Sequence, residues 1–165
     1  MQTSRRLLLA LAAASLCTGA FAQAWPTKPI RVVVPFPPGG GTDIIARETS
    51  QRVAAATGWT LVIDNKPGAG GNLGVDAVAK APADGYTIVL GQTSNLAINP
   101  TLYAKMPYDS QKDLAPIVLV ANAPLVMVTS ATSPFKTLTD AVAAAKAKPG
   151  ALNFASPGNG TVAHL

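Results

Sequence analysis

The segment from Val32 to Asp43 constrains the fold of this chain more than any other. A β-branched run, Val32 to Val34, gives way to three prolines within Pro35 to Pro38 and then to three consecutive glycines. An amphipathic segment from Asp43 to Thr57 follows and ends at Gly58. This order predicts a strand, a tight loop and a helix.

The glycine-rich loop has two interpretations. Glycines lack Cβ, so successive backbone N–H groups can turn toward one point at the positive end of a helix dipole, where a carboxylate or phosphate binds. The same residues also suit a plain connection between a strand and a helix. Phe36 stands directly before the glycines, at the strand end, where it either contacts a ligand or packs.

The first residues have the pattern of a secretory signal peptide. Arg5 and Arg6 precede an apolar run from Leu7 to Leu16, and the segment closes on the A-x-A site Ala20-Phe21-Ala22. The apolar run is too short for a permanent membrane span. We expect cleavage after Ala22 and export to the bacterial periplasm by the general route, although two arginines also suit a twin-arginine signal.

Charge and composition exclude several classes of partner. The net charge of +5 falls to +3 without Arg5 and Arg6, and the remaining lysines are scattered. This distribution argues against nucleic acid and is compatible with a small acidic ligand. No long apolar segment follows the signal, so we predict that the mature protein is not inserted in a membrane. The only cysteine, Cys17, lies within the signal, which excludes thiol chemistry afterwards.

Strand-loop-helix units recur along the chain. Thr60 to Asp64 predicts a second strand, and Leu73 to Lys80 predicts a second helix. Tyr86 to Leu90 is apolar on both faces and predicts a third strand, central in a parallel sheet. The alternation indicates an α/β fold with right-handed crossovers. Three loops should meet outside the carboxyl ends of the strands: Pro37 to Asp43, Pro67 to Asn72 and Gln92 to Asn95.

The pattern changes after a polar segment, Tyr103 to Asp113. Leu114 to Ala121 and Leu125 to Thr129 predict two closely spaced strands, a pair that often marks a crossing between domains. Thr137 to Asp140 fits the start of a helix with a capping box. Leu152 to Ala155 predicts another strand.

That strand leads into a second glycine-rich loop, Ser156 to Thr161, close to the end of the sequence. We therefore divide the chain into a signal peptide (1–22), a first α/β lobe (23–121) and the start of a second α/β lobe (122–165). On this division we expect a truncated two-domain protein.

Five motifs occur in one order: Trp25-Pro26-x-Lys28-Pro29-Ile30, the Phe36 to Asp43 segment, Pro67-Gly68-Ala69-Gly70-Gly71, Ala83-Asp84-Gly85-Tyr86-Thr87 and Ser156-Pro157-Gly158-Asn159-Gly160. Together they resemble the Bug family, the periplasmic solute-binding proteins of tripartite tricarboxylate transporters, from Trp25 to Leu165.

The resemblance implies a type II periplasmic-binding-protein fold, in which two lobes with mainly parallel sheets close on a carboxylate-bearing ligand. It further implies transport without catalysis, membrane components of the transporter as partners, and a monomer at full length. Family members are longer, so the resemblance implies that this chain holds only part of the second lobe.

The alternative function is a nucleotide- or phosphate-binding α/β enzyme that uses the first glycine-rich loop. That loop lacks the Lys-Ser/Thr ending of a P-loop and the G-x-G-x-x-G spacing, although Asp64 ends the second predicted strand as a dinucleotide site requires. Ser94 and Ser156 have no nearby base. His164 is the only histidine, which excludes a His-rich metal site, and we expect no cofactor.

Both glycine-rich loops enter the predicted binding site. Pro38 to Asp43 should bind one carboxylate through backbone N–H groups, with a hydroxyl from Thr42, and Ser156 to Thr161 should form the opposite wall. Asp43 has the position of a helix cap more than of a general base. The predicted ligand-binding residues are Phe36, Pro38, Gly39, Gly40, Gly41, Thr42, Asp43, Ser94, Asn95, Ser156, Gly158, Asn159, Gly160 and Thr161.

Overall fold

The computed structural model describes residues 25–165, so the predicted signal peptide lies outside the described residues. Within this part of the chain no helix is long and apolar enough to cross a membrane. The elements are β1 (Ile30–Val34), α2 (Gly41–Thr57), β2 (Leu61–Asn65), η1 (Ala69–Gly71), α3 (Asn72–Ala79), β3 (Thr87–Val89), η2 (Ser94–Ile98), α4 (Asn99–Leu102) and α5 (Leu138–Ala147).

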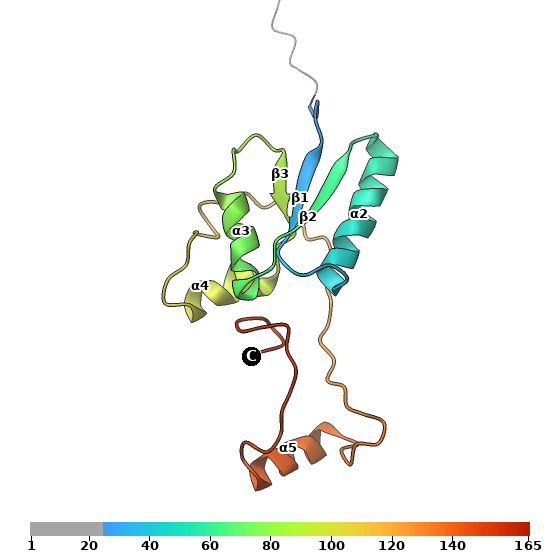
Figure 1. Cartoon of the computed structure of the whole chain (residues 1–165), viewed down its shortest axis with the longest axis vertical. Helices are drawn as coiled ribbons and strands as arrows, with labels where there is room; N and C mark the ends of the chain where they lie inside the picture. Colours follow the sequence, from blue (N-terminus) through green and yellow to red (C-terminus); the bar gives the residue numbers. More distant parts are fainter. Residues whose placement is uncertain (1–24) are drawn as a thin grey trace, which may run out of the picture.

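Three parallel strands form a sheet in the order β2-β1-β3 (Figure 1). β1 pairs with β2 from Ile30 opposite Leu61 to Val34 opposite Asn65. Every residue of β1 except Arg31 is buried, because the strand has a neighbour on each edge and contacts both α2 and α3. The described core therefore centres on β1.

Two helices cover this sheet. α2 contacts β1 and β2, and α3 contacts β1 and β3. Gly58 ends α2 in the left-handed conformation, with its N–H donated to the carbonyl of Ala54 at 2.8 Å. The alternation of strand and helix, with α/β architecture, is as the sequence predicts.

The position of the third strand differs from the prediction. The sequence predicts Tyr86 to Leu90 at the centre of the sheet, but β3 lies at an edge and its residues are half-buried. An apolar run on both faces of a strand indicates that both faces of the sheet are covered there, and α3 covers part of β3. The pattern does not indicate whether the strand lies at the centre or at an edge of the sheet.

The strands predicted at 114–121, 125–129 and 152–155 do not form. These segments run as irregular, mostly exposed chain between the sheet and α5 (Figure 1). A strand is stabilised by ladder hydrogen bonds to a neighbour, and no strand among residues 25–165 lies beside them. These segments have the β-branched composition of strands, but no neighbouring strand among residues 25–165 pairs with them.

The predicted capping box starts α5. The hydroxyl of Thr137 accepts the N–H of Asp140 at 3.2 Å, and the Asp140 carboxylate accepts the N–H of Thr137 at 2.9 Å. No residue of α5 is buried, and the helix lies apart from the sheet (Figure 1). Local capping, not packing, defines where this helix begins.

Candidate functional site

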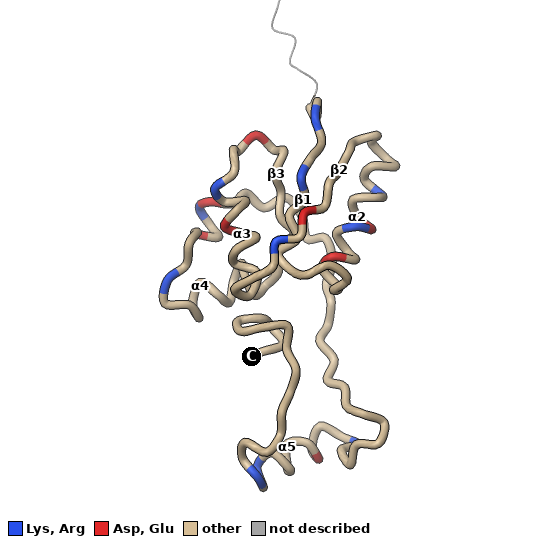
Figure 2. Tube along the Cα trace, viewed as in Figure 1, with Lys and Arg blue, Asp and Glu red and all other residues tan. Residues whose placement is uncertain are grey.

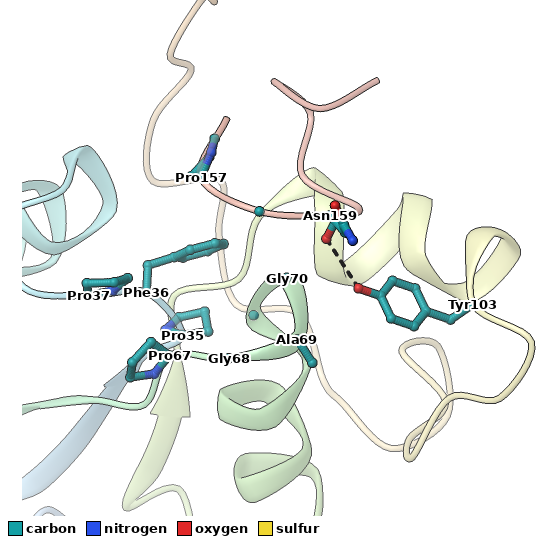
Figure 3. Close-up of a pocket in the computed structure, with 12 residues that line it drawn as sticks. Pro35, Phe36, Pro37, Pro67, Gly68, Ala69, Gly70, Tyr103, Pro157 and Asn159 are labelled. Atoms are coloured by element: carbon teal, nitrogen blue, oxygen red, sulfur yellow. Dashed lines mark hydrogen bonds between the residues drawn. The ribbon is translucent and has the colours of Figure 1, made fainter. Parts of the chain in front are cut away.

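A cavity of about 510 Å³ lies outside the carboxyl ends of β1 and β2 (Figure 3). The loop after β1 contributes Pro35 to Pro37, and the loop after β2 contributes Pro67 to Gly71. Tyr103, directly after α4, lines one side, and Pro157 to Asn159 close over the cavity from the end of the chain. Parallel α/β sheets bind ligands at this edge.

None of the residues that line the cavity carries a charge. Figure 2 shows the charged residues on the sheet, on the helices and on the loops between them, whereas residues 114–135 and 149–165 contain no lysine, arginine, aspartate or glutamate. Backbone groups, proline and aromatic rings and the Tyr103 hydroxyl make up the wall. The wall therefore offers only uncharged groups.

The turn into α2 is an internally bonded structure. Asp43 is almost completely buried, and its carboxylate accepts the N–H of Gly39, the Arg47 guanidinium and the Asn65 amide, each at 2.9 Å. The bond from Arg47, followed by those from Gly39 and Asn65, holds the pKa of Asp43 far below its ordinary value. The carboxylate therefore acts as a cap that fixes the loop.

Residues Pro38 to Asp43 do not line the cavity. Pro38, Gly39, Gly40 and Gly41 are exposed, and the N–H of Gly39 is already donated to Asp43. Of the ligand-binding residues predicted around this turn, only Phe36 lines the cavity, together with its neighbours Pro35 and Pro37. The carboxylate-binding role predicted for the turn stays a prediction.

The three strand-end loops meet, as predicted. The side-chain amide of Gln92 donates to the hydroxyl of Thr42, and the N–H of Gln92 donates to the Asn95 side chain at 2.9 Å. Ser94 and Asn95 are completely buried behind the cavity wall. The Asn95 amide nitrogen would lie 2.5 Å from a Cβ added at Gly71, so the loop after β2 needs a glycine there.

The second glycine-rich loop divides into exposed and buried residues. Ser156 is exposed, whereas Gly158 and Asn159 line the cavity. Gly160 and Thr161 are buried, and the Thr161 hydroxyl donates to the carbonyl of Gly158 at 2.7 Å, which closes the turn on itself. The loop therefore faces Phe36 and the β2 loop across the cavity (Figure 3).

Sequence reasoning missed Tyr103 as a cavity residue. It follows a short helix and opens a polar, irregular segment, which carries no motif. Its hydroxyl donates to the carbonyl of Asn159 at 3.2 Å (Figure 3). A contact across 56 residues of sequence leaves no local signal.

The residues that favoured an enzyme have structural partners. Asp64, the candidate ribose ligand, accepts the Nε of Arg31 at 2.7 Å on the neighbouring strand. His164 accepts the N–H of Gly160 at 3.5 Å. Within residues 25–165, no group of three or more His, Cys, Asp or Glu side chains is placed to hold a metal ion.

Three kinds of likeness connect the chain to known proteins. Residues 45–165 match the model of the tripartite tricarboxylate transporter family receptor. Protein BugT of Bordetella pertussis (strain Tohama I) is 40% identical over 156 residues, which is 94% of this chain and 48% of BugT.

Two solved structures are also similar. R. palustris Rpa4515 with adipate is 36% identical with a TM-score of 0.72, over 76% of this chain and 42% of that chain. The periplasmic binding protein BugD is 38% identical with a TM-score of 0.52, over 54% of this chain and 29% of that chain. This chain spans about half the length of the curated relatives it matches.

Proposed function

Because this chain belongs to the tripartite tricarboxylate transporter receptor family, we propose that it forms part of a periplasmic receptor for a small carboxylate-bearing ligand. The cavity carries this proposal. Its walls come from two strand-end loops and from the turn at residues 157–159, so a small ligand is enclosed from both sides. A neutral wall with backbone donors suits an anion, since burial strengthens each N–H to carboxylate bond.

The same proposal includes the cellular setting and the partners. The N-terminal pattern supports export to the periplasm, and the receptor hands its ligand to the membrane components of the transporter. Residues 23–121 form the first lobe and 122–165 begin the second. The similar Rpa4515 was solved with adipate, which supports a dicarboxylate as the class of ligand.

Backbone recognition of a carboxylate is the feature to test. Differential scanning fluorimetry of the exported form of this chain would compare adipate, succinate and citrate with adipamide, the uncharged diamide of adipate. We expect at least one carboxylate to raise the melting temperature by a few degrees at millimolar concentration, and adipamide to leave it unchanged. Equal shifts with adipate and adipamide would contradict recognition of the carboxylates.

A further inference from the structure

The turn from Pro157 to Thr161 rests against the first part of the chain at one place. The Tyr103 hydroxyl donates to the carbonyl of Asn159 at 3.2 Å (Figure 3). In the described part of the chain, this is the only hydrogen bond between residues 149–165 and residues 25–113. The other hydrogen bonds of the turn stay within residues 158–164.

Two glycines allow this close approach. A Cβ at Gly70, on the β2 loop, would lie 2.7 Å from the Asn159 carbonyl oxygen. A Cβ at Gly160, on the turn, would collide with the Asn99 side-chain oxygen and lie 2.9 Å from the Tyr103 ring. Both glycines also have positive φ, so the backbones meet where side chains are absent.

The surface that receives the turn is firmly held. Asn99 is completely buried, and its amide donates to the Asn72 side chain at 2.8 Å. Asn72 in turn accepts the Tyr108 hydroxyl at 3.1 Å. The first part of the chain therefore offers a fixed platform, while the turn reaches it through a long irregular segment.

We infer that Tyr103 is a positioning residue whose hydroxyl fixes the Pro157–Thr161 turn as the second wall of the cavity. Without this bond the turn keeps its internal hydrogen bonds but loses its only polar attachment to the platform among the described residues. The wall then opens more often and a bound ligand leaves faster. The contact between Tyr103 and the turn is present without a ligand. Its effect on ligand retention rests on the proposed function.

Hydrogen exchange on the ligand-free chain tests the contact. In Tyr103→Phe we expect the amides of residues 158–161 to exchange about three- to tenfold faster, as loss of one hydrogen bond allows. The matched control is Tyr86→Phe, because Tyr86 also uses its hydroxyl, as acceptor from the Thr27 N–H at 2.8 Å, but does not line the cavity. Unchanged exchange of 158–161 in Tyr103→Phe would overturn the inference.

A second pair of variants compares a glycine that touches the platform with a glycine of the same backbone conformation that does not. Gly160→Ala should speed exchange in the same peptide, because its Cβ meets Asn99 and Tyr103. Gly150→Ala is the control, since Gly150 has φ of 78° against 77° for Gly160 but has nothing within 4 Å of the added Cβ. Equal exchange at 158–161 in both variants would contradict the platform contact.

Adipate binding supplies the last readout. Tyr103→Phe should raise the dissociation rate about three- to tenfold, as loss of one hydrogen bond allows, and leave the association rate unchanged, while Tyr86→Phe behaves as the parent chain. Unchanged dissociation would refute the role of Tyr103 in retention. If adipate binds none of the three proteins, the proposed function fails, and the exchange experiment alone decides whether Tyr103 holds the turn.

Discussion

Single residues define the turn that leads into α2. Gly39 has φ of 82°, a conformation that costs a residue with Cβ about 1–2 kcal/mol. Gly41 begins the helix in open space. The three consecutive glycines are therefore not equivalent, although the sequence alone gives no reason to separate them.

This difference predicts opposite effects of two alanine substitutions. Gly39→Ala should lower the free energy of unfolding by about 1–2 kcal/mol, because its φ is unfavourable for alanine. Gly41→Ala should be neutral or slightly stabilising, since alanine favours the helix and restricts the unfolded chain. Urea denaturation measures both. Equal losses in the two variants would contradict the assigned backbone conformation.

Asp43 makes the free energy of unfolding depend on pH in the acid range. Its pKa in the folded protein lies well below that in the unfolded chain, so its contribution is complete above about pH 4 and is lost as the pH falls through the folded pKa. Asp43→Asn should lower the melting temperature at pH 7, and its difference from the parent chain should shrink toward about pH 2. Glu48→Gln, which removes an exposed i,i+4 pair with Arg52, serves as the control and should change little. A constant difference across this range would exclude the carboxylate as the cause.

Between elements, buried polar side chains join α3 to the segment around α4. The single hydroxyl proton of Tyr108 is donated mainly to the Asn95 carbonyl at 2.6 Å and is shared with the Asn72 side-chain oxygen at 3.1 Å. Burial, with a smaller effect of Asp76, raises the pKa of Tyr108 to about 12. The folded protein therefore keeps the Tyr108 hydroxyl proton at a pH of about 10, where the unfolded chain releases it.

The consequence is a loss of stability in alkali. The stabilisation from Tyr108 is complete below about pH 10 and disappears as the pH rises through about 12. Tyr108→Phe should lower the free energy of unfolding by about 1–2 kcal/mol at neutral pH, because buried acceptors lose their donor. The variant should also lose less stability than the parent chain between about pH 10 and 11.5. Urea titrations at these pH values measure both effects. Parallel pH profiles for the two proteins would show that Tyr108 is not the titrating group.

The sequence predicts those elements whose partners are near in the chain. β1, α2, β2 and α3 appear within a few residues of their predicted bounds, since hydrophobic period, glycine and capping are local. The predicted strand at 125–129 is absent, because strand formation depends on a neighbour that sequence composition does not supply. The central place of β1 likewise depends on topology.

The candidate site was predictable to a similar extent. Convergence of the three strand-end loops follows from parallel topology, and the resemblance to the Bug family is confirmed by the family match and by BugT. Neither Tyr103 nor the contact between Gly70 and Asn159 has a local pattern. Such residues are recognised only once distant segments are placed together.

The whole molecule exposes an apolar segment that its own sheet does not cover. Ile117 to Val120 and Leu125 to Val128 are largely exposed, with Met127 at 80% and Val128 at 82%. Residues 114–135 also lack charge, and the backbone here has no strand partner among the described residues (Figure 2). Uncharged, β-branched and unpaired segments associate with one another.

We therefore expect this chain to self-associate at micromolar concentration. Val118→Lys combined with Val126→Lys should shift it toward monomer, because charge opposes strand pairing. Ile44→Lys, which adds a charge at an exposed apolar residue of α2, should leave association unchanged. Sedimentation velocity decides between the variants. A parent chain that stays monomeric would contradict the prediction that the exposed apolar segment drives self-association.

Binding of a dicarboxylate in the cavity between the strand-end loops and the Pro157–Thr161 turn connects the fold to the proposed function. An NMR titration with adipate of the variant that combines Val118→Lys with Val126→Lys, in which self-association is reduced, observes this binding residue by residue once the backbone amides are assigned. We expect saturable shifts at Gly70, Gly71, Gly158 and Asn159, with weak affinity, and small effects on α5. Saturable shifts confined to residues outside the cavity, or none up to tens of millimolar adipate, would contradict a carboxylate site at this place.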